Sequence, residues 1–137
     1  MAGKPTDHMK NISDILVLFV DDESDTINGL KRFFRTAPFR TEFAGSGAEA
    51  MQMIERNPAD ILVTDVLMPG MSGIELAKRA KSRQPGMLCM LVTGSNNMDE
   101  IVRSSKTANI FNYLSKPVDP VSFRQNIEHA VSLCCSA

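Results

Sequence analysis

Apolar residues occur along this chain in two alternating patterns, short continuous runs and stretches with helical spacing. The first continuous run covers residues 15–20, and its length and β-branched side chains favour a strand buried on both faces. Residues 39–44 are predicted to form a short second strand, and further apolar runs predict strands at residues 60–66, 87–92 and 110–114. Runs with no polar face are typical of parallel sheets that helices cover on both sides.

Each predicted strand is followed by apolar residues spaced three or four apart, which indicates five amphipathic helices. Ser24 or Asp25 is the expected N-cap of the first helix, and the capping boxes Ser46/Glu49 and Ser72/Glu75 start the second and third. The fourth helix is expected to start near Met98, and the fifth with Asp119 as N-cap and Pro120 as its first residue. The residues expected to face the core are Ile27, Leu30, Phe33, Phe34, Ala50, Met51, Ile54, Ile74, Ala77, Ala80, Met98, Ile101, Val102, Val121, Ile127, Val131 and Cys134.

Five strands that alternate with five helices predict an α/β fold, a parallel sheet with helices on both faces. We expect a flexible leader at residues 1–13 and one domain at residues 14–135. Right-handed crossovers bring the carboxyl ends of all the strands to one edge, where ligands collect in open parallel sheets.

Composition narrows the classes of partner. With 137 residues, 43% of them hydrophobic, the chain can bury one substantial core. The net charge is −1 and no basic run reaches five residues, so we expect no nucleic-acid partner. No apolar stretch approaches the roughly 18 residues that span a bilayer, so we expect no membrane partner. The odd number of cysteines, three, fits a reducing cytosol and a cytoplasmic location.

The predicted strand ends carry polar residues with a common chemistry. Asp21 and Asp22 follow the first strand, Asp65 ends the third, Thr93 follows the fourth and Lys116 follows the fifth. Two like charges about 4 Å apart cost roughly 4 kcal/mol at an effective dielectric of 20, so a cation is needed. Oxygen ligands without His or Cys favour Mg²⁺. Metal, ammonium and hydroxyl together suit phosphoryl transfer, with Asp65 as the nucleophile.

Four stretches at these strand ends resemble the receiver domain of two-component response regulators, in the CheY-like superfamily. They are residues 19–23 (FVDDE), 64–73 (TDVLMPGMSG), 91–94 (LVTG) and 113–117 (YLSKP), and the resemblance extends over about residues 15–134. It implies a doubly wound, flavodoxin-like sheet with strand order 2-1-3-4-5. It also implies phosphorelay signal transduction by a regulatory phosphoacceptor that is not an enzyme for other substrates.

The resemblance implies roles for the acidic residues. Asp65 would be the phosphoacceptor and a metal ligand. Asp22 would bind Mg²⁺ directly, and Asp21 would hold it largely through water. The backbone carbonyl of Leu67 would be a further ligand. Leu67 and Ser95 lie at positions that vary among receivers, so they bear on the lifetime of the phosphoryl group.

The remaining roles concern the phosphoryl group and the switch. The resemblance implies that Thr93 donates a hydrogen bond to the phosphoryl group, that Lys116 pairs with it, and that a cis peptide bond precedes Pro117. Tyr113 matches the switch aromatic, which turns inward as Thr93 moves.

The implied partners are a sensor histidine kinase or phosphotransfer protein, or a small acyl phosphate, and a downstream effector or fused output domain. Residues 109–119 (NIFNYLSKPVD) are similar to receivers fused to cyclic-dinucleotide phosphodiesterases. A phosphorylation-dependent dimer would use the last two helices and the strand between them.

Three alternatives compete with this interpretation. A haloacid-dehalogenase-like phosphohydrolase would carry a second Asp two residues after the nucleophile, where this chain has Leu67. A flavodoxin-like cofactor binder would need a Ser/Thr/Gly loop after the first strand, whereas residues 21–23 are acidic and repel phosphate. A degenerate receiver would bind partners without phosphorylation.

Overall fold

The computed structural model describes residues 10–94 and 96–135. Its strands are β1 (Leu16–Val20), β2 (Arg40–Ala44), β3 (Ile61–Asp65), β4 (Leu88–Thr93) and β5 (Asn112–Ser115). Its α-helices are α2 (Ser24–Phe33), α3 (Gly47–Arg56), α4 (Gly73–Arg83), α5 (Met98–Ser104) and α6 (Pro120–Cys135), and the short 3₁₀ helices are η1 (Ile12–Asp14) and η2 (Lys106–Ala108). All neighbouring strands pair in parallel in the order β2-β1-β3-β4-β5, which confirms the predicted fold class.

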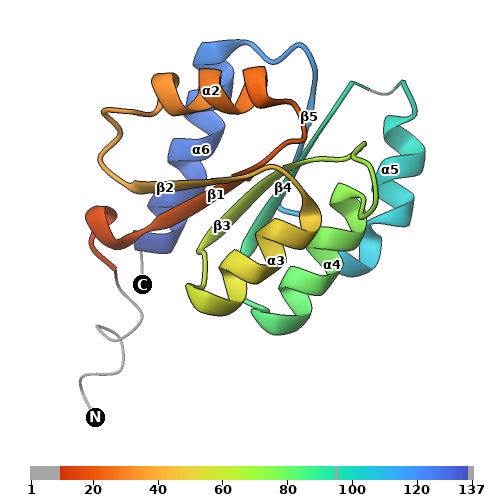
Figure 1. Ribbon diagram of the computed structural model, residues 1–137, viewed down its shortest axis with the longest axis horizontal. Helices are drawn as coiled ribbons and strands as arrows, with labels where there is room; N and C mark the ends of the chain where they lie inside the picture. Colours follow the sequence, from red (N-terminus) through yellow and green to blue (C-terminus); the bar gives the residue numbers. More distant parts are fainter. Residues whose placement is uncertain (1–9, 95, 136–137) are drawn as a thin grey trace.

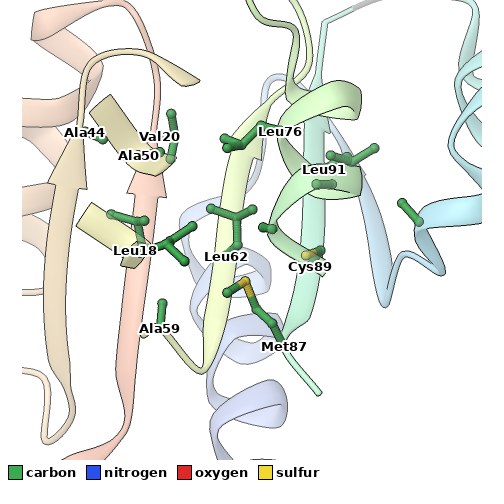
Figure 2. Close-up of a cluster of buried hydrophobic side chains, with 14 of the residues drawn as sticks. Leu18, Val20, Ala44, Ala50, Ala59, Leu62, Leu76, Met87, Cys89 and Leu91 are labelled. Atoms are coloured by element: carbon green, nitrogen blue, oxygen red, sulfur yellow. The ribbon is translucent and has the colours of Figure 1, made fainter. Parts of the chain in front are cut away.

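Helices cover both faces of the sheet, with α2 and α6 on one side and α3, α4 and α5 on the other (Figure 1). Alternate strand residues therefore enter two separate cores. The first core cluster lies under α3, α4 and α5, and Leu18, Leu62 and Leu91 extend into it from three strands (Figure 2). The second core cluster lies under α2 and α6 and includes Val17 and Phe19. β1 and β3 are buried along their whole length, which explains their apolar sequences, whereas the edge strands β2 and β5 are only partly buried.

The predicted helix starts are confirmed for α3, α4 and α6. The hydroxyl of Ser46 accepts the Glu49 N–H at 3.1 Å, and the hydroxyl of Ser72 accepts the Glu75 N–H at 3.2 Å. The Asp119 carboxylate accepts the Ser122 N–H at 2.9 Å, with the same spacing of three residues. These bonds satisfy N–H groups that have no partner within the helix.

The predicted N-cap of the first helix, Ser24 or Asp25, is wrong, because the cap is Glu23 and the helix begins at Ser24. The Asp21 carboxylate accepts the Glu23 N–H at 2.9 Å, a local turn that brings the chain into helical conformation one residue early.

The predicted core faces of α5 and α6 are partly wrong. In α6, Phe123 and Ile127 face the sheet. Val121 lies about 200° around the helix from Phe123 and therefore faces solvent, with 64% of the residue exposed. In α5 only Ile101 is buried, and Val102, which lies about 100° around the helix from it, is 39% exposed.

Nearest the amino terminus, the described chain begins at Lys10, so residues 1–9 of the predicted leader lie outside the described residues. Lys10 Nζ lies 2.7 Å from a carboxylate oxygen of Asp60, whose other oxygen accepts the Leu16 N–H at 2.9 Å. No helix in the described ranges is long and apolar enough to cross a bilayer.

Gly73, the first residue of α4, lies directly against the end of β3. Its N–H donates to the Val66 carbonyl at 2.9 Å, and a Cβ added there would lie 2.0 Å from the carbonyl oxygen of Asp65. That distance is far below a van der Waals contact, so only glycine allows α4 to begin this close to the strand.

We predict that Gly73→Ala lowers the free energy of unfolding by about 2 kcal/mol or more, because backbone must move to admit the methyl group. Gly86→Ala is the matched control, since nothing lies within 4 Å of its added Cβ, and we expect a change of at most about 0.5 kcal/mol. Urea unfolding of the three proteins measures both values. Equal stability of the two variants would contradict the close contact.

Candidate functional site

The polar residues predicted at the strand ends come together at the carboxyl edge of the sheet. Asp21 and Asp22 follow β1, and Asp65 is the last residue of β3. Thr93 ends β4 and pairs in register with Ser115, so Lys116 follows at the neighbouring position of β5. Short, parallel strands of similar length bring these five side chains to one edge.

The three carboxylates form one compact acidic cluster. Asp21, Asp22 and Asp65 each offer an oxygen, and these oxygens all lie within 4.8 Å of one another. Asp21 and Asp65 are buried, whereas Asp22 is exposed. Carboxylate oxygens at this separation fit a hard divalent cation, and Mg²⁺ accepts such a set together with water. The donor chemistry of the cluster thus suits Mg²⁺.

Lys116 lies against two of the three carboxylates. Its Nζ is 3.2 Å from Asp65 Oδ2 and 3.6 Å from Asp21 Oδ2. Its backbone N–H donates to the Thr93 carbonyl at 2.8 Å, and the peptide bond to Pro117 is cis, as predicted. The β5 backbone therefore holds the ammonium beside the acidic cluster.

Thr64 is a residue of this site that the sequence interpretation missed. Its side chain is fully buried, and its hydroxyl donates to the carbonyl oxygen of Asp65 at 2.9 Å. The Val66 N–H donates to the Val92 carbonyl at 3.0 Å, so the backbone is held on both sides of Asp65. The only signal in the sequence was one threonine within an otherwise apolar run.

Burial and charge act in opposite directions on the central ion pair. Burial raises the pKa of Asp65 above its ordinary value of 3.8; the hydrogen bond and charge of Lys116 lower it, Asp21 raises it further, and burial prevails. For Lys116, burial lowers the pKa, but the hydrogen bonds and charges of Asp65 and Asp21 together raise it. The side chain of Asp65 is the more deeply buried, with 10% exposed, so burial outweighs the attraction of Lys116 and the pKa of Asp65 rises. The side chain of Lys116 is 32% exposed, so the attraction of the carboxylates outweighs burial and the pKa of Lys116 rises as well.

A cavity of about 510 Å³ opens beside the cluster. Asp21, Asp65 and Lys116 contribute its charged wall, and Leu30 and Phe123 contribute apolar surface from α2 and α6. This arrangement leaves room for a group larger than a metal ion next to the carboxylates.

Leu67 and Tyr113 are the remaining predicted site residues in the described part of the chain. The side chain of Leu67 is 66% exposed on the loop after β3. Tyr113 lies on β5, where its hydroxyl is 2.7 Å from that of Ser105. Ser95 lies outside the described residues.

We predict that Asp65→Asn stabilises the fold in Mg²⁺-free buffer at neutral pH, by on the order of 1 kcal/mol, because it removes a buried charge. Folded Asp65 keeps its proton at pH values where the unfolded chain, with the ordinary value of 3.8, has lost it. The stability of the parent should therefore fall as pH rises from about 4, and the stability of the variant should fall less. Urea unfolding across this pH range tests the sign, and a less stable variant at neutral pH would mean that the Lys116 attraction outweighs burial.

The sequence and the fold of this chain are similar to those of known proteins. The family model of the response regulator receiver domain covers residues 17–128. A crystal structure of a CheY-like receiver domain protein from Methanospirillum hungatei JF-1 superposes with a TM-score of 0.82 at 27% identity, over 89% of this chain and 97% of that one.

Curated relatives are longer proteins. The chain is 30% identical over 115 residues to the hydrogenase transcriptional regulatory protein HoxA of Cupriavidus necator, covering 84% of this chain and 24% of the relative. It is also 30% identical over 115 residues to a cyclic di-GMP phosphodiesterase of Thermotoga maritima, covering 84% and 30%. The chain thus spans less than a third of either relative. Its fold, the residues at its strand ends and the family match together identify the chain as a member of the response regulator receiver domain family.

Proposed function

We propose that this receiver accepts a phosphoryl group on Asp65, in a Mg²⁺-dependent step, and switches a protein-binding surface in response. The observation that carries the proposal is the acidic cluster with Lys116 Nζ at 3.2 Å from Asp65 Oδ2. Three carboxylates and one ammonium leave an excess of negative charge that a divalent cation balances. The donor is a phosphohistidine of a sensor kinase or phosphotransfer protein, or a small acyl phosphate, in the cytoplasm.

The transfer needs little more than position and charge. A carboxylate oxygen of Asp65 attacks phosphorus, a new O–P bond forms, and the bond from phosphorus to the donor nitrogen or oxygen breaks. The leaving group departs with that electron pair. Lys116 and the Thr93 hydroxyl stabilise the charge on the phosphoryl oxygens, which Mg²⁺, when bound, neutralises further.

The acidic residues have different roles as ligands of the metal ion. Asp22 is the exposed member of the cluster and would bind Mg²⁺ directly. Buried Asp21, whose Oδ1 already accepts the Glu23 N–H, would act largely through water. Asp65 and the backbone carbonyl of Leu67 would be the other protein ligands.

Phosphorylation of Asp65 changes the conformation of the surface formed by α5, β5 and α6. Thr93 gains a hydrogen bond that exists only after phosphorylation, and Tyr113 turns toward it. Such a bond biases an equilibrium between two arrangements. This surface then binds a downstream effector, an output domain of the same polypeptide, or a second phosphorylated copy.

The kind of output follows from the relatives only as a proposal. Their names include a transcriptional regulator and a cyclic di-GMP phosphodiesterase. The similarity of residues 109–119 to receivers joined to such phosphodiesterases favours the second kind.

The competing functions have less support. The family match does not favour a haloacid-dehalogenase-like hydrolase or a flavodoxin-like cofactor binder. The position that would supply the second Asp of the hydrolase is Leu67, which cannot transfer a proton. A degenerate receiver would lack part of the acidic, hydroxyl and lysine set, whereas this chain carries all five residues.

We predict that incubation with Mg²⁺ and acetyl phosphate adds one phosphoryl group, on Asp65. Asp65→Asn should add none, because an amide is not a nucleophile for phosphorus. Intact-protein mass spectrometry measures the gain, and alkaline treatment should remove it from the parent.

Chelation of Mg²⁺ is the first control for this experiment and should abolish the gain. Asp22→Ala is the second, and it should reduce the gain by removing the direct metal ligand. A parent that gains no mass, or an Asp65→Asn variant that gains the same mass at the same rate, contradicts the assignment. No gain in the parent would favour the degenerate receiver.

We predict that Leu67 prolongs the lifetime of the phosphoryl group. Hydrolysis needs a water in line with phosphorus, and the apolar, exposed side chain of Leu67 cannot hold one by a hydrogen bond. Leu67→Asn and Leu67→Glu should each lose phosphate at least about threefold faster, which is less than 1 kcal/mol of barrier. Decay of the three purified phosphoproteins is compared at equal Mg²⁺ and pH, and a parent as fast as both variants would exclude this role.

A further inference from the structure

Ser105 forms the joint between α5 and η2. It is the C-cap of α5, and its side chain is completely buried. Its N–H donates to the Ile101 carbonyl at 3.0 Å, and its own carbonyl accepts the Ala108 N–H at 2.9 Å. The backbone therefore fixes the position of the Ser105 hydroxyl relative to α5.

The direction of the bond between Ser105 and Tyr113 follows from the neighbours of the hydroxyl. Ser105 Oγ lies 2.7 Å from the Ile101 carbonyl oxygen, 3.3 Å from that of Val102 and 2.7 Å from the Tyr113 hydroxyl. A carbonyl only accepts, and serine has one hydrogen, which goes to the nearer carbonyl, that of Ile101. Tyr113 is therefore the donor, and Ser105 is its acceptor.

Helix α5 has few other attachments to the core. It has seven residues, and only Ile101 among them is buried. By comparison, α4 buries Gly73, Leu76, Ala77 and Ala80. The hydrogen bond from Tyr113 of β5 to Ser105 therefore adds an attachment at the C-terminal end of a helix that buries little apolar surface.

The bond points Tyr113 away from the functional site. Tyr113 packs against the first core cluster and pairs in register with Leu91, so it lies on the same face of the sheet as Thr93, two residues after Leu91. Helix α5 follows the loop after β4 and runs back along the sheet (Figure 1), so its end lies roughly 10 Å from its start. A Tyr113 hydroxyl bound to Ser105 is therefore held toward the C-terminal end of α5, the end farther from the loop after β4.

We propose that Ser105 is a positioning residue that holds Tyr113 away from Thr93 and thereby couples α5 to the state of Asp65. The inference rests on the proposed function. When Tyr113 leaves, Ser105 keeps its bond to Ile101, and the half-buried tyrosine can reach water, so the bond can open without leaving a buried hydroxyl unpaired. A neutral hydrogen bond of this kind shifts a two-state equilibrium by roughly two- to tenfold.

The test is the affinity for beryllium fluoride with Mg²⁺, a mimic of the phosphoryl group. Because the mimic favours the arrangement in which the Tyr113 bond is open, Ser105→Ala should bind it about two- to tenfold more tightly. Ser104→Ala is the matched control. Its hydroxyl donates to backbone carbonyls of its own helix, those of Glu100 and Ile101, and its midpoint should equal that of the parent.

Tyrosine fluorescence gives a local readout, because Tyr113 is the single tyrosine and the chain has no tryptophan. In Ser105→Ala without the mimic, the signal should already lie part of the way toward the value reached with it. Tyr113→Phe should tighten binding by a similar factor, measured by beryllium fluoride titration of amide shifts. The double variant should bind no more tightly than either single variant, because both changes remove the same bond.

The outcomes separate the two proposals. If the parent neither binds the mimic nor accepts a phosphoryl group, the proposed function fails and the coupling fails with it. If the parent does both and Ser105→Ala matches Ser104→Ala, or binds the mimic more weakly than the parent, only the role of Ser105 is overturned. Additive effects in the double variant would also overturn it.

Discussion

The repulsion among three carboxylates is the constraint on which this structure depends. At a separation of about 4.8 Å, two unit charges repel by roughly 3 kcal/mol at an effective dielectric of 20, and a single ammonium offsets only part of the total. The carboxylates stay together because strands with a core on each face hold them there. The repulsion therefore makes the fold less stable than it would be without these charges, and the excess negative charge suits a divalent cation.

The structure is anchored unevenly around this site. Helices α3 and α4 bury several residues each, and α4 begins against the backbone of Asp65. Helix α5 is held by Ile101 and by the bond between Ser105 and Tyr113. Local opening costs least where few apolar contacts are lost, so we expect α5 to open more readily than α3 or α4.

Much of this architecture was predictable because burial on both faces leaves a strong pattern in the sequence. Each apolar run ends where the strand reaches the edge, so the sequence alone assigns Asp21, Asp65 and Lys116 to one site. It does not assign Ser105, because a serine within a helical stretch is typical of a solvent-facing position. Its burial depends on a carbonyl four residues earlier and on a tyrosine from the next strand, and both partners are defined only in space. Val102 was misassigned because it is adjacent to Ile101, and only Ile101 of the two faces the core.

The contact between Gly73 and the end of β3 also closes a ring. The Gly73 N–H donates to the Val66 carbonyl at 2.9 Å, so the segment between them starts and finishes at the same point. Because this hydrogen bond joins Val66 to Gly73, the two residues stay together when the number of residues between them changes. An insertion or deletion within this segment, which includes Leu67, would therefore change the shape of the loop and leave the Asp65 carboxylate where it is. Length variation here offers a route by which related chains could alter access to the site without rebuilding it.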